Sequence, residues 1–401
     1  MAASVWALFL GVLLLMVGNG LLGSILGIRA DLDGLATTSI GLVMASYYIG
    51  FLIGSLTIPV RLASVGHIRV FAGLASLASS TALCHALVLD PVTWSALRFV
   101  TGLCLSGLYV TIESWLNERA TNATRGRLLS IYMVVVTVGI GAGQLLLGVA
   151  DPLGPGLFIG ASLLLSLAVV PVALSRIPAP TAAVRASLPV RTLARAAPLG
   201  AVTAVLVGAS NSAIFGLGAV YATKVGMSPG RAGLFVGASM VGAILLQYPL
   251  GHLSDRFPRR RVIFLAATGA VVAAVTGTSV DADGLALFVV AAVYGSLAFP
   301  MYSLAVSHIN DVMEGDQLVA TAAGVLFLYG VGSVGGPILT SILMTILGPV
   351  GYLWSLAGFF APVAVYSFYR VLTHVRPRQR PFVNVPASTA VAVSELVEDP
   401  E

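Results

Sequence analysis

The stretch Gly251-His-Leu-Ser-Asp255-Arg-Phe-Pro258-Arg-Arg-Arg261 decides the fold class of this chain. Apolar runs of membrane-spanning length flank it, from 232 to 250 and from 262 to 280. Because an acid and four arginines are costly in lipid, the stretch is predicted to be a tight polar hairpin between two membrane helices. Its arginines place the hairpin on the cytoplasmic side of the membrane.

The composition of the 401-residue chain agrees with this prediction. Hydrophobic residues make up 58% and charged residues only 9%, whereas soluble domains carry about 25% charged residues. The net charge of +5 falls in loops, where basic residues set membrane orientation, so nucleic-acid binding is not expected. Both cysteines, Cys84 and Cys104, lie in apolar runs, so neither a disulfide framework nor a metal site is predicted. No P-loop sequence is present, which argues against ATP as the energy source.

The apolar runs predict twelve membrane helices and therefore an all-α membrane fold. The first six spans are expected at roughly 5–28, 38–60, 68–89, 92–117, 127–150 and 155–175. The last six are expected at roughly 198–223, 231–250, 262–280, 285–309, 318–346 and 349–370. The predicted domains are thus an N-terminal half (1–175), a cytoplasmic linker (176–197), a C-terminal half (198–373) and a disordered cytoplasmic tail (374–401).

The distribution of basic residues predicts the orientation. With the N-terminus in the cytoplasm, 17 of the 21 Lys and Arg residues fall on the cytoplasmic side and 3 on the outer side, while Arg98 is left within a span. Both termini are therefore expected in the cytoplasm. The first apolar run is long and lacks a basic flank, so a cleaved signal peptide is not expected.

The two halves are also related in sequence. A shift of 192 residues places Asn19 on Asn211, Gly34 on Gly226 and Gly50 on Gly242. A shift of 193 places Gly102 on Gly295, Tyr109 on Tyr302, Gly139 on Gly332 and Gly143 on Gly336. Because each half contains an even number of spans, the repeats are predicted to be parallel and related by an axis along the membrane normal.

Two local motifs resemble those of the major facilitator superfamily. The order Gly-x-Leu-x-Asp-Arg-x-x-Arg-Arg at 251–260 resembles its motif A, and Arg98-x-x-x-Gly102 resembles its motif B. The run 113–127 is similar to a bacterial branch of uncharacterised transporters. The resemblance covers roughly 5–375 and implies two six-helix halves that work by alternating access. One departure is that Ala63 stands in the first half where Asp255 stands in the second. A contact that closes the cytoplasmic side is therefore either weaker in the first half or formed by other residues.

Arg98 and Glu113 are the charged residues predicted to lie deep in a span, and they are candidates for proton coupling. Arg98 is expected either to face the central cavity and handle protons or an anionic group, or to extend to the outer headgroups. Glu113 lies fifteen residues further along the same span. An apolar environment favours the neutral carboxyl, as a proton carrier requires. The alternative is a structural ion pair with Arg61, Arg119 or Arg127.

Neutral polar residues are candidates for the substrate cavity. Asn19 and Asn211 lie in the first and seventh spans, and Tyr109 and Tyr302 in the fourth and tenth. The resemblance implies that these four spans line the cavity, where the residues would offer hydrogen bonds and aromatic faces. The alternative is that they form interhelical hydrogen bonds that hold the helices together.

The polar loop and the acids after the tenth span are predicted to form a cytoplasmic gate. The resemblance implies that the motif A acid contacts the neighbouring half when the cytoplasmic side is closed. The predicted gate residues are Asp255, Arg256, Arg260 and Asp311. The four arginines of the loop are expected to pair with Asp311, Glu314 or Asp316, which follow the tenth span.

The resemblance and these residues together predict a secondary transporter of the bacterial inner membrane. Its expected partners are a small amphipathic or neutral organic substrate, protons and membrane lipid; a monomer without cofactor, metal or enzymatic activity is expected. Proton-coupled efflux is the first hypothesis. Proton-linked uptake and a non-transporting membrane sensor or assembly factor on the same fold stay open, because a fold does not fix a function.

Overall fold

The computed structural model describes residues 2–119, 122–174, 190–282, 284–313 and 318–373. Within this part of the chain, twelve helical segments are long and apolar enough to cross a membrane, and no strand is present. The predicted all-α membrane fold is therefore confirmed. The predicted tail, 374–401, and most of the predicted linker, 175–189, lie outside the described residues.

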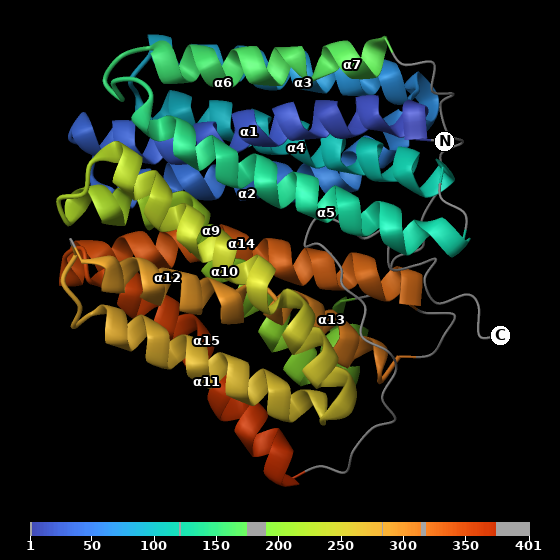
Figure 1. Cartoon of the computed structure of the whole chain (residues 1–401), viewed down its shortest axis with the longest axis vertical. Helices are drawn as coiled ribbons and strands as arrows, with labels where there is room; N and C mark the ends of the chain where they lie inside the picture. The colour runs from blue at the N-terminus through green and yellow to red at the C-terminus, as the bar shows by residue number, and fades with distance from the viewer. Residues whose placement is uncertain (1, 120–121, 175–189, 283, 314–317, 374–401) are drawn as a thin grey trace. The chain divides into compact units, whose positions relative to one another are not determined.

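The chain forms two compact units. The first comprises Met1–Val184 with Ser228–Gly233, and the second comprises Arg185–Met227 with Leu234–Glu401. Helices of the first unit are α1 (Ala2–Leu32), α2 (Thr37–Val65), α3 (His67–Leu87), α4 (Pro91–Arg119), α5 (Asn122–Leu145), α6 (Gly156–Leu167) and α7 (Val169–Ala173), with the 3-10 turn η1 (Leu146–Gly148) after α5. Within this unit α2 packs along α4, α1 along α5, and α3 against α4 and α6 (Figure 1).

The second unit repeats this arrangement. Its helices are α8 (Val190–Ala196), α9 (Pro198–Lys224), α10 (Pro229–Arg256), α11 (Arg259–Gly277), α12 (Leu285–Ala298), α13 (Met301–Asn310), α14 (Leu318–Leu347) and α15 (Gly351–Thr373). The first residues of α10, up to Gly233, are grouped with the first unit. Helix α8 falls within the segment predicted as a linker. The tenth span is divided into α12 and α13 at Pro300, which has no backbone N–H to donate to the preceding turn. Helix α9 packs along α14, and α11 packs along α15.

Close helix crossings follow the predicted sequence repeat. A Cβ atom on Gly102 of α4 would lie 1.9 Å from the Tyr47 carbonyl oxygen of α2, and one on Gly295 of α12 would lie 2.0 Å from the Ser239 carbonyl oxygen of α10. These two contacts are related by the shifts of 193 and 192 residues. Glycine is required at both positions because any side chain would push the backbones apart.

The turns repeat as well. Gly34 ends the turn after α1 with φ of 79°, and Gly226 ends the turn after α9 with φ of 93°. Both angles lie in the left-handed region that glycine adopts without steric cost. The two glycines are related by the shift of 192 residues, so the same turn is used in each unit.

The polar stretch that was predicted as a hairpin is shorter than expected. Helix α10 continues to Arg256 and α11 begins at Arg259, so only Phe257 and Pro258 lie between them. The last turn of α10 stays helical because Ser254 is buried and Arg256 is favourable at the negative end of the helix dipole. Pro258 cannot continue α10 and instead precedes the first turn of α11.

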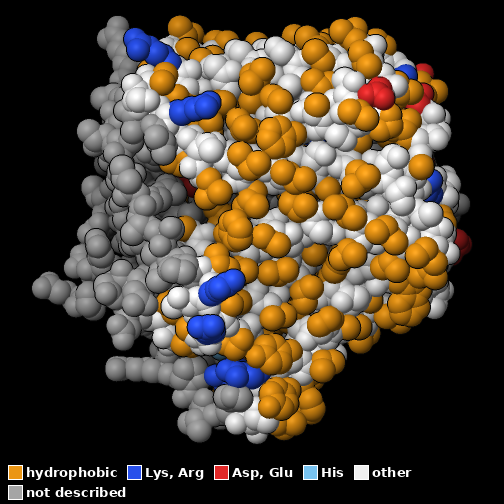
Figure 2. Space-filling view, turned by 180° about the vertical axis from the view of Figure 1, so that it is seen from behind, with side chains coloured by type: hydrophobic (Ala, Val, Ile, Leu, Met, Phe, Trp, Pro, Cys, Tyr) orange, Lys and Arg blue, Asp and Glu red, His pale blue; other side chains and the backbone are white. Residues whose placement is uncertain are grey.

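The surface agrees with a membrane location. Figure 2 shows hydrophobic side chains over most of the visible face, with Lys, Arg, Asp and Glu side chains toward its left and right sides. Large apolar residues such as Leu245, Tyr248 and Val365 are highly exposed. Exposed apolar side chains on this scale are unusual for soluble monomers and are expected where lipid is the solvent.

Candidate transport site

Arg98 is buried among the helices of the first unit. It lies on α4 with 5% of its surface exposed, and its Cζ atom is 4.5 Å from the centre of the Tyr47 ring on α2. Its Nε and Nη1 atoms are buried and have no hydrogen-bond partner. The side chain therefore packs inside the unit and does not extend over its surface.

A row of aromatic side chains leads away from Arg98. The Tyr47 and Phe51 ring centres are 6.1 Å apart, and those of Phe51 and Tyr109 are 5.9 Å apart. The Tyr109 hydroxyl donates a hydrogen bond of 3.0 Å to the Met16 sulfur on α1. The row thus joins Arg98 to Tyr109, a predicted cavity residue, through side chains of α2 that sequence reasoning did not single out.

Glu113 is fully buried near the other end of α4. Its Oε1 atom accepts a hydrogen bond of 3.4 Å from the Tyr132 hydroxyl on α5. Fifteen residues separate it from Arg98, which corresponds to about 22 Å along a helix, so the two predicted coupling residues are not brought together. The side chains of Arg119 and Arg127 lie outside the described ones, and the ion-pair alternative for Glu113 stays a prediction.

The predicted cavity asparagines differ in environment. Asn19 on α1 is half-buried. Asn211 on α9 is buried and donates a hydrogen bond of 3.4 Å to the Tyr329 hydroxyl on α14, while its Oδ1 atom is buried without a partner. Tyr302 packs edge-on against Tyr329 with 5.1 Å between ring centres. The structure therefore joins Asn211 and Tyr302 through Tyr329, which the repeat pattern did not reveal because no tyrosine occupies its counterpart, Val136.

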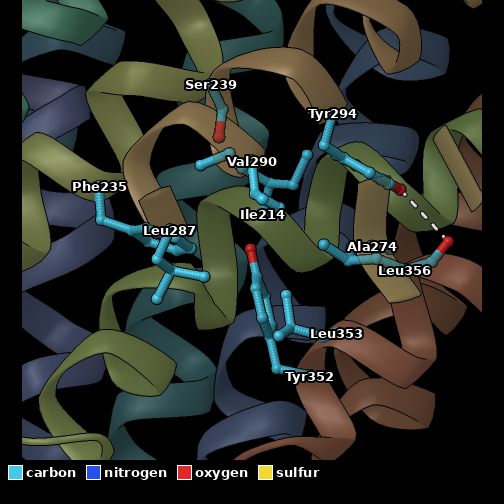
Figure 3. A pocket seen from close by; sticks show the side chains of 11 residues that line it. Ile214, Phe235, Ser239, Ala274, Leu287, Val290, Tyr294, Tyr352, Leu353 and Leu356 are labelled. Atoms are coloured by element: carbon cyan, nitrogen blue, oxygen red, sulfur yellow. Dashed lines mark hydrogen bonds between the residues drawn. The ribbon is translucent and has the colours of Figure 1, made fainter. Parts of the chain in front are cut away.

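The second unit also contains a small cavity between α9, α10, α11, α12 and α15 (Figure 3). Its volume of about 10 Å³ has room for about one water molecule. The walls are mainly apolar, and the Ser239 and Tyr352 hydroxyls point inward. The Tyr294 hydroxyl turns away and donates to the Leu356 carbonyl oxygen at 3.3 Å. The cavity is too small for an organic substrate in this conformation.

The predicted gate residues Asp255 and Asp311 approach the same arginine, Arg259. The Arg259 Nε atom is 2.8 Å from Asp311 Oδ2, and both side chains are buried. The Arg259 Nη2 atom is 3.7 Å from Asp255 Oδ1, and Asp255 is largely exposed. Arg256 is exposed and Arg260 half-buried, while Glu314 and Asp316 lie outside the described residues.

Arg259 was not singled out as a gate residue, but it is one of the four loop arginines that were expected to pair with Asp311, Glu314 or Asp316, and it does pair with Asp311. The sequence also contains a signal for its burial. Val262, Ile263 and Ala266 are buried on the same helix, and Arg259 precedes them by three, four and seven positions, which places it on their face. Its counterpart under the shift of 192 is His67, which is also buried and lies with Nε2 3.0 Å from Ser114 Oγ.

The described residues contain no cluster of three or more His, Cys, Asp or Glu side chains that could hold a metal ion. What the arrangement offers is a buried guanidinium beside aromatic rings, a buried carboxyl, and a charged cluster at the end of the second unit. Ionisable residues buried within membrane spans are candidates for binding sites and ion pathways.

The chain is similar to known proteins over most of its length. The chain is 27% identical over 342 residues to "Uncharacterized MFS-type transporter YcaD" of Escherichia fergusonii, a match that covers 85% of this chain and 88% of that protein. It is 28% identical over 343 residues to an "Uncharacterized MFS-type transporter" of Yersinia pseudotuberculosis, covering 84% and 88%.

Solved structures share the fold. The nucleoside transporter NupG matches with a TM-score of 0.78 at 14% identity, covering 93% of this chain and 100% of that one. A D-xylose-proton symporter matches with a TM-score of 0.65 at 15% identity, covering 90% and 96%. The family model of the Major Facilitator Superfamily matches residues 8–199 and 199–400. The chain therefore belongs to the Major Facilitator Superfamily.

Proposed function

We propose that the chain is a proton-coupled secondary transporter that exports a small amphipathic organic solute across the bacterial inner membrane. The observation that carries proton coupling is Glu113, a carboxyl with no exposed surface inside a membrane span. Such a group is costly to keep charged in a protein interior, and a proton removes that cost. A carboxyl that alternates between its protonated and its charged form as the halves rearrange couples proton movement to transport.

A second direction is proton-linked uptake, which two proteins of the same fold are named for. They are the D-xylose-proton symporter and the E. coli fucose:proton symporter, and the latter matches with a TM-score of 0.56 at 15% identity. At such identities the likeness extends to the fold alone. Efflux stays the first proposal, and the direction of flux decides between them.

The experiment begins with the purified protein and a library of metabolites and drugs. Ligands are identified by a rise in the unfolding temperature, because binding to the native state stabilises it. These ligands are then tested for transport in proteoliposomes with an imposed pH gradient. Efflux predicts that solute moves against the direction of proton flow, and uptake predicts that the two move together. Binding without flux in either direction would support a sensor and contradict a transporter.

The proposed orientation has both termini in the cytoplasm. It rests on the asymmetric distribution of basic residues between the loops. Reporter fusions after Pro198 and at the C-terminus should both report a cytoplasmic location. A periplasmic signal from either fusion contradicts the orientation.

A further inference from the structure

Arg98 is a buried charge without an acidic partner among the described residues of its own unit. Among the described residues, none forms an ion pair with it, and its Nε and Nη1 atoms are buried without a hydrogen-bond partner. The face of the Tyr47 ring attracts the guanidinium but carries no net charge. A buried cation is costly unless it is paired, so this position requires an explanation.

The related position in the second unit shows that the fold does not require an arginine here. The shifts of 193 and 192 residues place Arg98 on Ala291 and Tyr47 on Ser239. Helices α10 and α12 cross at Gly295 as closely as α2 and α4 cross at Gly102. Ala291 and Ser239 line the small cavity of Figure 3. The same crossing therefore forms with two small side chains, and a structural role does not account for Arg98.

The surroundings of Arg98 are suited to the apolar body of a ligand. Tyr48 packs edge-on against Tyr47 with 5.1 Å between ring centres, and Phe51 follows on the same helix. Tyr48 and Phe51 are only half-buried, so this aromatic wall has an open side. Aromatic rings bury large apolar area and stack on planar groups of a ligand.

The single positive charge of Arg98 limits the net charge of the ligand that fits this position. A single guanidinium is neutralised by one negative charge, whereas a doubly charged phosphate monoester would leave an unpaired charge in the same apolar surroundings. A carboxylate carries one charge and has the planar geometry that arginine donors match. A neutral ligand would leave the buried charge of Arg98 uncompensated.

We propose that Arg98, Tyr47, Tyr48 and Phe51 form a binding site for a monocarboxylate with an aromatic or similarly apolar body. The carboxylate accepts hydrogen bonds from the Arg98 guanidinium, and the body packs on the aromatic wall. The proposal rests on the proposed transport function only in identifying this ligand as the transported solute; the site itself is tested by binding.

The probe is benzoate, compared with benzamide, which has nearly the same shape but no charge, and with phenyl phosphate, which carries a second charge. Binding is measured on the full-length purified protein by thermal shift and by quenching of tryptophan fluorescence. We expect benzoate to bind at least about 10-fold more tightly than benzamide, because a charged partner of a buried arginine is strongly preferred. Phenyl phosphate should bind more weakly than benzoate.

Variants locate the site. Arg98→Gln should abolish the preference for benzoate over benzamide, and Arg98→Lys should keep part of it because the charge stays but the planar donors are lost. Phe51→Ala should weaken benzoate and benzamide alike. Arg69→Gln removes an exposed arginine of the same unit and is the matched control, with no expected change. Arg98→Ala, which copies Ala291, provides a folded reference if Arg98→Gln is poorly expressed.

Equal binding of benzoate and benzamide by the wild-type protein would overturn the proposal, as would an unchanged preference in Arg98→Gln. Tighter binding of phenyl phosphate would overturn the monocarboxylate class. Benzoate binding that depends on Arg98, in a protein that shows no flux in proteoliposomes, would support the site and contradict the transport function. The two failures are therefore distinguishable.

Discussion

Arg259 and Asp311 form an ion pair inside the second unit, with 2.8 Å between Nε and Oδ2 and only 1% of each side chain exposed. Arg259 also faces Asp255, but at 3.7 Å and with 41% of the Asp255 side chain exposed. The same guanidinium thus has one buried and one exposed acidic neighbour. Their contributions to stability should differ because solvent screens the exposed charge.

Asp311→Asn is expected to destabilise the protein more than Asp255→Asn. Removing the buried partner takes away the nearest acidic neighbour of a buried charge, at a cost of about 3–5 kcal/mol, whereas removing the exposed partner costs about 1 kcal/mol or less. Thermal unfolding of the two variants in the same detergent measures the difference. Equal losses would mean that the Arg259–Asp311 pair is not a main stabilising contact of this cluster.

Gly102→Ala is expected to disrupt the first unit. The new Cβ atom would lie 1.9 Å from the Tyr47 carbonyl oxygen, so α2 and α4 must separate. Overpacking of this kind costs about 1–3 kcal/mol or more. Gly141→Ala on α5 is the matched control, because no described atom of another helix lies within 4 Å of its Cβ position. There the exchange should be neutral or stabilising by up to about 1 kcal/mol. Comparable unfolding temperatures for the two variants would contradict the tight crossing.

Stability at the start of α4 should depend on pH through Asp90. The Thr93 backbone N–H donates a hydrogen bond of 2.7 Å to Asp90 Oδ2, which lowers the pKa of Asp90 below its ordinary value of 3.8. Because the folded pKa is the lower one, the contribution is fully present above the ordinary pKa and is lost as the pH falls through the folded pKa. Asp90→Ala should therefore unfold earlier than the wild type at pH 7, and the gap should narrow toward about pH 3.

Asp90→Asn is the control for this dependence. Asparagine can cap the helix but does not titrate in this range, so the gap between Asp90→Asn and Asp90→Ala should stay constant with pH. If the difference in stability between the wild type and Asp90→Ala is equally constant with pH, the charge of Asp90 does not contribute to stability.

The positions of the membrane spans could be predicted closely because each span must be a continuous apolar run along the sequence. The fourth span was expected at 92–117 and is found at Pro91–Leu116, since apolar runs and their polar ends are local in sequence. The repeat also aligned Gly102 with Gly295, and the structure shows that each marks a close helix crossing.

The candidate site was less accessible to sequence reasoning. Tyr329 meets Asn211 across 118 residues, and no local pattern connects them. The aromatic partners of Arg98 lie on α2 and are found only once α2 and α4 pack. The volume of the small cavity depends on side-chain sizes from five helices, which a pattern along one helix does not encode.

Glu113→Gln is expected to abolish proton-coupled transport while the protein still folds. Glutamine preserves the shape of the side chain and can accept the hydrogen bond from Tyr132, but it cannot carry a proton. Counterflow, the exchange of labelled for unlabelled solute, should persist because it requires no net proton movement. Both activities are measured in proteoliposomes with the solute found by the binding screen.

Tyr132→Phe is the companion variant. It removes the hydroxyl near Glu113 but leaves the carboxyl, so it should shift the pH dependence of transport without abolishing it. Full proton-driven flux in Glu113→Gln would assign Glu113 to structure and leave the coupling residue unidentified.

Asp255→Asn is expected to shift the transporter toward the inward-open state. The resemblance to motif A implies that Asp255 contacts the neighbouring half when the cytoplasmic gate is closed. A contact made in one state only would bias the conformational equilibrium. A loss of about 1–2 kcal/mol corresponds to a shift of roughly 5–30-fold. Because Ala63 replaces the equivalent acid in the first half, the second half has to supply this bias.

Cysteine pairs placed across the cytoplasmic gate should therefore crosslink more slowly in Asp255→Asn, and pairs across the outer gate should crosslink faster. Arg256→Gln, which alters a neighbouring exposed charge, tests whether any change of charge in this turn has the same effect. Both shifts together require a change of equilibrium between two states, since simple loosening of the cytoplasmic end would not close the outer end. Unchanged crosslinking on both faces would reduce Asp255 to an exposed neighbour of Arg259 and would remove it from the gate.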